Sequence, residues 1–381
     1  MDVLPLELWC NVFAFLDTTS LLRATLVSHK WRGVVWQGAT HYKINTAFFA
    51  RLRGGASKQK EALSNVLRFL STNCPRLRSL DLSNTNIVLT PALVAAFPPG
   101  LRHLNLERCT QLYDESLCCL PSSLCSLTLD LNAQLTNKAL NHLPKGLKQL
   151  RLSHCWQLND RSFLEVHGSS EAEGSGMPSR PLWDQLELLD LSSCWKLSDA
   201  ALQKLSSFTT LKTLDLNNCS FSDQGLAYLP PSLRVLILER CDQMRGTGFH
   251  LLGEGLEELN ISFCSRIVVE AFAGLPKRLL KLEMAGMVYL KDEHMEVLPR
   301  SLQSLNIAEC VHITDEGLLR LPPTLVRLTL SKTKVTAQGL HQCALHLRKL
   351  REVNIQGCKL IKEDHLNELR HHFGERIRFA F

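Results

Sequence analysis

The feature that most constrains this chain is a leucine pattern that mostly returns every 22 to 25 residues. Each copy reads Leu-x-x-Leu-x-Leu-x-x-Cys or a near variant. The first leucines of the copies are Leu77, Leu101, Leu124, Leu147, Leu186, Leu211, Leu233, Leu256, Leu279, Leu302, Leu325 and Leu350. Twelve phased copies predict a stack of similar units rather than ordinary globular domains.

The chemistry of one copy indicates what each unit contains. Leu236 and Leu238 alternate as expected for a short strand with one buried face. A turn and a short apolar helix follow, which Thr314 or Asp315 can cap in one copy. Prolines after a leucine end these helices, at Pro121, Pro144, Pro230, Pro276, Pro299 and Pro322. This pattern is typical of leucine-rich repeats, and it predicts an α/β leucine-rich-repeat solenoid, a horseshoe of about twelve repeats.

Eight of the fourteen cysteines occupy the closing position of a repeat. They are Cys109, Cys155, Cys194, Cys219, Cys241, Cys264, Cys310 and Cys358. A small buried thiol with a weak S–H donor suits a tight turn. Zinc binding is the alternative, but the chain has no Cys-x-x-Cys pair, and its C-terminal histidine cluster from His341 to His372 fits no zinc spacing. We therefore expect no metal and no cofactor, and we expect Cys118 and Cys119 to fill the core.

The composition indicates a folded protein without nucleic-acid or membrane partners. Hydrophobic residues make up 45% and charged residues 21% of the 381 residues, and the net charge of +6 forms no basic tail. No run of eighteen uncharged apolar residues exists, and Asp2 and Glu7 interrupt the apolar start, unlike a signal peptide. Fourteen cysteines without an export signal favour reduced thiols, and therefore a cytoplasmic or nuclear location.

Residues 1–40 do not share the repeat period and predict three short helices. Leu8, Val12 and Leu16 recur every four residues after Leu4-Pro5, as in an amphipathic helix with proline in its first turn. Forty residues are too few for an independent core, so this module must dock on something.

This module resembles an F-box along its whole length. The matching stretches are Leu4-Pro5-Leu6-Glu7-Leu8, Val12-Phe13-Ala14-Phe15-Leu16-Asp17, Leu21-Leu22-Arg23-Ala24 and Leu26-Val27-Ser28-His29-Lys30-Trp31-Arg32. The cysteine-closed repeats likewise resemble those of F-box/leucine-rich-repeat proteins, although they are slightly shorter and carry Leu-Pro stops.

The resemblance implies a substrate receptor of an SCF-type cullin–RING ubiquitin ligase. In that family the F-box binds a Skp-type adaptor, which connects to the cullin, and the repeats bind the protein to be ubiquitinated. By resemblance, the adaptor-binding residues are Leu4, Pro5, Leu8, Val12, Phe13, Leu16, Leu21, Leu22, Val27 and Trp31. The alternative is that these helices only cap the open edge of the solenoid.

The exposed strand positions predict an acidic concave face. The second, fourth and sixth residues after each lead leucine point outward, because side chains alternate along a strand. Nine of them are acidic: Asp81, Glu107, Asp130, Asp190, Asp215, Glu239, Glu258, Glu283 and Glu352. Three are basic: Arg151, Lys281 and Arg327. The surplus favours a basic partner surface, whereas the recurrence of Asp and Asn at the fourth position favours a structural habit of the repeat.

Two tryptophans stand directly after closing cysteines in repeats that flank an insertion. Exposed, Trp156 and Trp195 would anchor a protein partner, and buried, they would fill the turn between strand and helix. The candidate substrate-binding set is Arg151, His154, Trp156, Asp190, Trp195, Asp215 and Glu239.

The remaining segments give the domain boundaries. Residues 1–40 form the helical module, 41–76 a basic linker and N-terminal capping segment, and 77–381 the repeat domain. The step from Leu147 to Leu186 measures 39 residues, and its Gly- and Ser-rich part, 168–181, predicts a flexible insertion. It is a tolerated insertion, or a cover or phosphate acceptor at Ser170.

We expect no enzyme. The chain has no Walker loop, Rossmann glycine pattern, nucleophile elbow or metalloprotease helix, and no RING-like ligand array of its own. The alternative function is a non-catalytic scaffold or inhibitor that acts without ubiquitin transfer.

Overall fold

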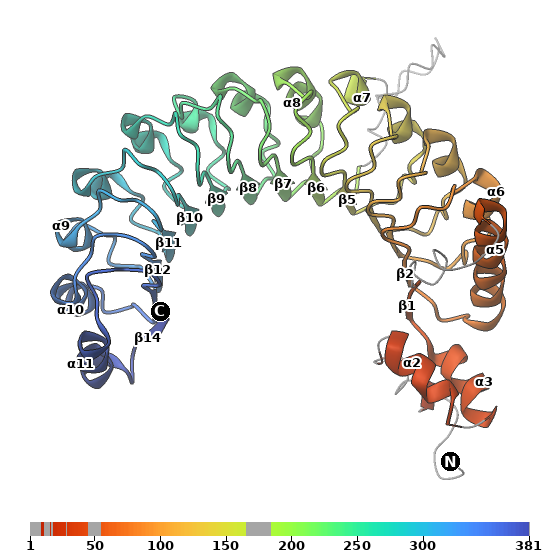
Figure 1. The fold of residues 1–381 in the computed structure, drawn as a ribbon. Coiled ribbons are helices and arrows are strands. Elements are labelled where there is room, and N and C mark those ends of the chain that lie inside the picture. Colours follow the sequence, from red (N-terminus) through yellow and green to blue (C-terminus); the bar gives the residue numbers. More distant parts are fainter. Residues whose placement is uncertain are drawn as a thin grey trace. The chain divides into compact units, whose positions relative to one another are not determined.

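The computed structural model describes residues 9–10, 16, 18–27, 29–44, 55–164 and 184–380. It divides the chain into two compact units, Met1–Cys194 and Trp195–Phe381. In each unit, short parallel strands lie side by side and helices or helical turns lie opposite them (Figure 1). The predicted leucine-rich-repeat solenoid is therefore confirmed.

The described part of the first unit contains the N-terminal module and six strands. Its helices are α2 (Thr18–Thr25), α3 (His29–Gly38), α5 (Gly55–Asn73), α6 (Pro91–Val94), η1 (Asp114–Cys119), η2 (Asn137–His142) and α7 (Arg161–Leu164). Its strands are β1 (His41–Lys43), β2 (Ser79–Asp81), β3 (His103–Asn105), β4 (Ser126–Thr128), β5 (Gln149–Arg151) and β6 (Leu188–Asp190). Each pairs in parallel with the next, and the central leucines of β2 to β6 form one buried row.

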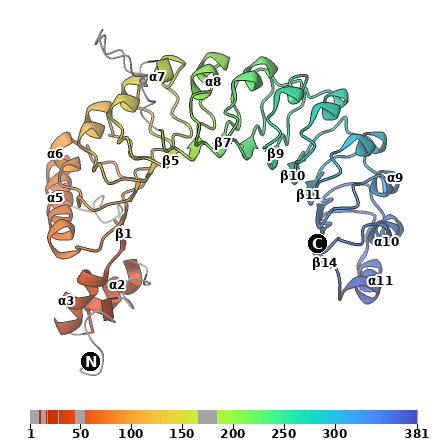
Figure 2. The ribbon, with the colours of Figure 1, turned by 180° about the vertical axis from the view of Figure 1, so that it is seen from behind.

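The second unit contains eight strands. Its helices are α8 (Asp199–Leu205), η4 (Asp223–Tyr228), η5 (Phe249–Leu251), η6 (Val269–Gly274), η7 (Asp292–Val297), α9 (Asp315–Leu319), α10 (Ala337–His346) and α11 (Glu363–Phe373). Its strands are β7 (Thr213–Asp215), β8 (Val235–Ile237), β9 (Glu258–Asn260), β10 (Lys281–Glu283), β11 (Ser304–Asn306), β12 (Arg327–Thr329), β13 (Glu352–Asn354) and β14 (Arg378–Ala380). They follow one another in sequence order, with α9, α10 and α11 on the side away from the strands (Figure 2).

Two strands lie outside the twelve leucine copies. β1 and the long helix α5 fall within residues 41–76, where the sequence predicted a linker and a capping segment. β14 follows α11, and its lead position holds Arg376 in place of leucine. Tyr42 and Phe379 occupy the central position of these end strands, so a search for leucine does not find them.

The closing cysteines are buried, as predicted, and most of them also donate a hydrogen bond to the preceding repeat. The Cys155 thiol donates to the Leu129 carbonyl at 3.3 Å, and the Cys264 thiol donates to the Leu238 carbonyl at 2.9 Å. The same bond to the preceding repeat recurs at Cys109, Cys194, Cys241, Cys310 and Cys358. Four of the twelve copies have no closing cysteine, and in one of them the Asn132 side-chain amide donates to the Leu106 carbonyl of the preceding repeat instead. The thiol therefore supplies a hydrogen-bond donor to a buried carbonyl that has no partner in the sheet.

The residue before each closing position adopts a left-handed conformation. Ten such residues are not glycine, among them Arg108 (φ 51) and Leu131 (φ 60), and Gly286 and Gly357 complete the series. A left-handed residue with a Cβ costs about 1–2 kcal/mol. Its amide donates to the next repeat, as from Arg108 to the Asp130 carbonyl at 2.9 Å, which offsets this strain.

A second ladder links the helical side of the repeats. Asp292 accepts the backbone N–H of Thr314 at 2.8 Å and its hydroxyl at 2.6 Å. Asp114, Asp199 and Asp315 do the same for the next Thr or Ser. Thr314 in turn caps α9, so each aspartate positions the helix start of its neighbour.

Cys118 and Cys119 do not fill the core, and that expectation was wrong. Cys118 is exposed and Cys119 half-buried. They end η1, whose buried side is taken by Ser116 and Leu117. A 3₁₀ helix has three residues per turn, so the side chains of Cys118 and Cys119, which follow the buried Ser116 and Leu117, point away from the core.

Candidate protein-binding surfaces

The N-terminal module packs one of its faces on its own chain. Its core is Ala24, Val35 and Ala39, with Trp9, Leu16, Trp31, Val34 and Trp36 packed against it. The Trp36 ring meets Phe69 of α5 edge-on, with centroids 5.3 Å apart, and it also lies 5.8 Å from the Tyr42 ring of β1. The module therefore covers the edge of the first repeat.

The same module also presents apolar side chains to solvent. Leu26 is 79% exposed and Val27 is 63% exposed, although both follow directly on α2. Their amides donate to the Arg23 and Ala24 carbonyls at 3.0 and 3.2 Å, so the turn holds both side chains outward. Leu26 has the largest exposed fraction of any large hydrophobic residue in the described chain. Such a pair marks a surface that another protein can cover.

The predicted adaptor-binding residues divide into three groups. Leu4, Pro5, Leu8, Val12 and Phe13 lie outside the described residues, and so do the side chains of Leu21 and Leu22 on α2. Leu16 and Trp31 are half-buried in the module core, where the Trp31 ring lies 5.3 Å from that of Trp9. Val27 is exposed. Leu26 was not among the predicted contacts, because the spacing of leucines in a helix does not tell which one faces water.

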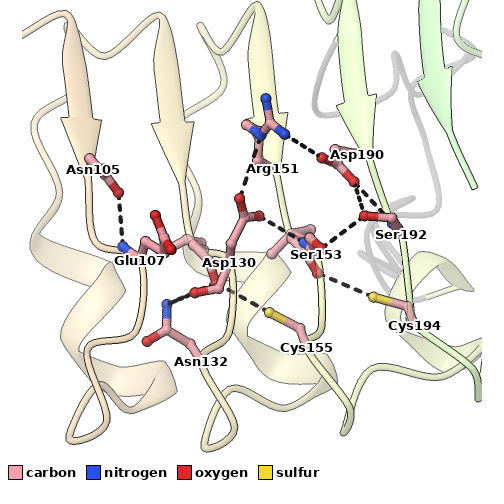
Figure 3. A network of polar contacts seen from close by, with 12 residues as sticks. Asn105, Glu107, Asp130, Asn132, Arg151, Ser153, Cys155, Asp190, Ser192 and Cys194 are labelled. Atoms are coloured by element: carbon pink, nitrogen blue, oxygen red, sulfur yellow. Dashed lines mark hydrogen bonds and ion pairs between the residues drawn. The ribbon is translucent and has the colours of Figure 1, made fainter. Parts of the chain in front are cut away.

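On the sheet face of the first unit, Arg151 lies between two carboxylates from neighbouring strands (Figure 3). Its Nη2 lies 2.9 Å from Asp190 Oδ2, and its Nε lies 3.5 Å from Asp130 Oδ2. The Asp190 side chain is only 4% exposed. Asp130 also accepts the Ser153 amide at 2.8 Å, and Asp190 accepts the Ser192 amide and hydroxyl. Two members of the candidate substrate-binding set, Arg151 and Asp190, therefore form an ion pair, and Asp130 joins them.

The carboxyl of Asp130 is the group whose charge is hardest to maintain in this cluster. Its pKa is raised from 3.8 to about 6, chiefly by burial and also by the Asp190 charge, while the hydrogen bond from the Ser153 amide and the Arg151 charge lower it. Arg151 is shared between two carboxylates, so it does not compensate both in full. The network consequently changes its net charge near pH 6.

The acidic residues at the fourth position after a lead leucine have a structural role in the repeat. Asp81, Asp190 and Asp215 each accept the amide two residues later, at 2.8 to 3.0 Å. The asparagines at the same position do likewise: Asn105, Asn260, Asn306 and Asn354. Aspartate and asparagine recur there because either side chain closes the turn after the strand.

Much of the predicted acidity is paired within the chain. Asp81 lies 3.0 Å from Lys43 Nζ in the first unit. In the second unit Lys281 lies 3.5 Å from Glu258 and 3.4 Å from Glu283, and Glu239 pairs with Arg240 at 2.5 Å. The sheet face is therefore a mosaic of both signs rather than a continuous acidic strip.

The remaining members of the candidate substrate-binding set lie at several places. Trp156 in the first unit is 46% exposed and Trp195 in the second is 62% exposed, so neither fills a turn. His154 is a left-handed residue (φ 55) whose amide donates to the Ser192 carbonyl. Asp215 closes its own turn, and Glu239 accepts from Asn260 at 3.4 Å.

A groove of about 400 Å³ lies on the sheet face over β10 to β14. In the strand register Glu352 stands between Arg327 and Arg378, and all three line the groove. The sequence did not indicate Arg378, because β14 lacks the leucine pattern. The groove is lined by three basic side chains, those of Lys281, Arg327 and Arg378, and by two acidic ones, those of Glu283 and Glu352.

The described residues contain no cluster of three His, Cys, Asp or Glu side chains that could hold a metal ion. The C-terminal histidines form ring contacts instead, such as His341 and His372 with centroids 5.5 Å apart. Across the same described ranges, every helix is too short or too polar to cross a membrane.

Comparisons with known proteins agree with this architecture. A family model described as F-box-like matches residues 1–46, and one described as Leucine Rich repeat matches residues 209–229 and 299–321. No curated protein matches the sequence. The solved structures that are similar include Rad7 from the yeast Rad7 and Elc1 complex, at 16% identity and a TM-score of 0.52 over 99% of this chain and 98% of that chain. An internalin from Listeria monocytogenes is similar at 18% identity and a TM-score of 0.52, over 85% of this chain and 94% of its own.

At these identities the two structures show the fold, and the family models assign its parts. The chain therefore carries an F-box-like domain at its N-terminus, followed by leucine-rich repeats.

Proposed function

We propose that the chain is the substrate-recognition subunit of an SCF-type E3 ubiquitin ligase. In this proposal the F-box-like module binds a Skp-type adaptor, the adaptor connects to a cullin, and the repeats bind the protein to be ubiquitinated. The chain itself is non-catalytic, and the ubiquitin chemistry belongs to its partners. With all fourteen cysteines free, it acts in the cytoplasm or the nucleus.

The observation that carries the proposal is the exposed pair Leu26 and Val27 inside the segment that matches an F-box-like domain. A module that served only as a cap would bury its apolar side chains on the repeats. Here one face packs on Phe69 and Tyr42, while Leu26 and Val27 face solvent. In the similar yeast structure Rad7 is in a complex with Elc1, which supports a partner-binding role for this architecture.

The test is affinity capture of the full chain from cells treated with a proteasome inhibitor. The unmodified chain should recover a Skp-type adaptor, a cullin and a client protein. A Leu26→Glu, Val27→Glu variant should lose the adaptor and the cullin by about 30-fold or more, because charges replace two desolvated anchors. The client should remain bound, since the repeats are unchanged.

The matched control is Leu345→Glu, which places the same charge on an exposed leucine of α10 (58% exposed). It should retain adaptor, cullin and client. Equal adaptor recovery from the double variant would contradict the proposal. Recovery of a client without any adaptor by the unmodified chain would favour the scaffold or inhibitor function.

A further inference from the structure

The fourteen cysteines fall into two chemical classes. Eleven are buried, Cys118 is exposed, and Cys119 and Cys125 are half-buried. Burial raises the pKa of the Cys74 thiol to about 11 and that of the Cys264 thiol to about 12. Since the thiolate is the reactive form, buried thiols with such a raised pKa are inert at neutral pH. Most members of that class are also held by a carbonyl of the neighbouring repeat.

Cys118 and Cys119 differ from the buried class in both access and geometry. Their Sγ atoms lie 3.4 Å apart at the end of η1, and either thiol can donate to the other. Two accessible sulfur atoms in contact make a bidentate pair. Cys125, the other accessible thiol, donates to the Ser123 carbonyl at 3.6 Å and belongs to the following strand segment.

The surroundings of the pair supply no third ligand. The carboxylate of Asp114 in the same helix is already bonded to the amide and hydroxyl of Thr136. No metal-binding group of three side chains occurs in the described chain. A tetrahedral zinc site, which needs four ligands, is therefore not available here. Sulfur ligands prefer soft ions, and two of them suit an ion of low coordination number.

The same geometry disfavours direct closure to a disulfide. The Cα atoms of adjacent residues are about 3.8 Å apart across a trans peptide. Unstrained disulfides need a Cα separation of about 4.4–6.8 Å and a sulfur separation of about 2.05 Å. Chelation across the observed 3.4 Å leaves the turn undisturbed, whereas disulfide closure would distort it.

We propose that Cys118 and Cys119 form a dithiol site for soft, trivalent thiophilic ligands, of which organic arsenoxides are the defining class. The reaction is a condensation without oxidation or reduction. Each thiol gives up its proton, two sulfur–arsenic bonds replace the arsenic–oxygen bonds, and the oxygen leaves with both protons as water. The arsenic remains trivalent.

The experiment uses the folded full chain, phenylarsine oxide as the probe and an excess of glutathione, followed by intact mass spectrometry. Glutathione removes adducts on single thiols, whereas the cyclic adduct is retained. The expected result is one adduct per chain, released by dimercaptopropanol. In Cys118→Ser and in Cys119→Ser the retained adduct should fall by about 100-fold, because the second bond is no longer intramolecular.

Cys125→Ser is the matched control and should retain the adduct in full, because it removes an accessible thiol outside the pair. Circular dichroism should show that all three variants are folded. Retention of the adduct in either variant of the pair would overturn the proposal. Mapping of the adduct to a buried cysteine by peptide digestion would overturn it as well.

Discussion

The N-terminal module and the repeats differ in how far they expose the same types of apolar side chain to solvent. In the repeats the central residues of the strands are buried, as at Leu282 (0% exposed), and a polar ladder closes each turn. In the module Leu26 and Val27 are mostly exposed, although a helix and a tryptophan core lie beside them. In the repeats, each copy covers the apolar residues of its neighbour. In the module, part of the apolar surface stays exposed, and we propose that a partner covers it.

Because of this difference, we expect the repeats to determine the stability of the chain and the module to determine the binding of the proposed adaptor. Each repeat is covered by the next copy, so its buried strand residues and closing cysteine contact only adjacent repeats of the same chain. The module has a single neighbouring repeat, and Leu26 and Val27 on its outer face stay uncovered; the proposed adaptor would cover them. Substitutions at ladder positions should therefore change the stability of the chain, whereas substitutions on the exposed face of the module should change binding.

The largest expected effect is on the strand core. Leu282→Ala should lower the free energy of unfolding by about 2–5 kcal/mol, because it leaves a cavity among the central leucines. Leu26→Ala should change it by less than about 0.5 kcal/mol, because that side chain is exposed. Urea denaturation followed by circular dichroism measures both. Equal losses would mean that Leu26 is part of the fold.

The next effect is a pH dependence from the Asp130 carboxyl. Its pKa is about 6 in the folded chain and 3.8 in its ordinary state, so between these values the folded chain holds a proton that the unfolded chain has lost. Stability from this group is thus complete below pH 4 and decreases as the pH rises to about 6. Asp130→Asn should remove this decrease and raise the free energy of unfolding at pH 7 by about 1–3 kcal/mol.

The Asn side chain can still accept the Ser153 amide, so the turn is retained. Denaturation of both chains at several pH values tests the prediction, with Glu254→Gln on the exposed surface as the control. A pH dependence between 4 and 6 that is identical in Asp130→Asn and the parent chain would show that this carboxyl does not titrate in that range.

The cysteine ladder gives a smaller effect. Cys155→Ala should cost about 1–2 kcal/mol, because it leaves the buried Leu129 carbonyl without its 3.3 Å thiol bond. Cys118→Ala at the exposed site should cost less than about 0.5 kcal/mol. Thermal denaturation compares the two. If Cys118→Ala were the more damaging change, the division of the thiols into structural and accessible classes would not hold.

The smallest effect concerns the left-handed turn residue. Arg108→Gly should stabilise the chain by about 0.5–1 kcal/mol, because glycine adopts φ 51 without steric cost. Arg102→Gly is the matched control, since Arg102 is exposed in the same repeat and lacks a positive φ. It should destabilise the chain by a similar amount. Chemical denaturation with both variants side by side tests the sign.

The repeat architecture was predictable because its signal is repeated twelve times. One strand position or closing cysteine is weak by itself, whereas Leu233 to Cys241 and its eleven counterparts together define strand, turn and spacing. The end strands were not predictable, because Ala39, Tyr42 and Phe379 carry no periodic signal. The burial of the closing thiols likewise followed from their chemistry. The exposure of Cys118 did not, because it depends on the handedness and pitch of a short helix.

The candidate site was predictable in part. Arg151 and Asp190 stand at the same position of adjacent repeats, so parallel register brings them together. The pKa of Asp130 depends chiefly on the burial of its carboxyl, which spacing along the chain does not show. The pairing of Lys281 with two carboxylates also depends on side-chain geometry rather than on the count of charges.

Hydrogen exchange of the full chain with and without a purified Skp-type adaptor tests the central claim most directly. We expect slower exchange in peptides covering residues 16–36, with unchanged exchange in peptides from the strands β2 to β13. Slower exchange confined to the repeats, or none anywhere at saturating adaptor, would contradict the assignment of coupling to the module.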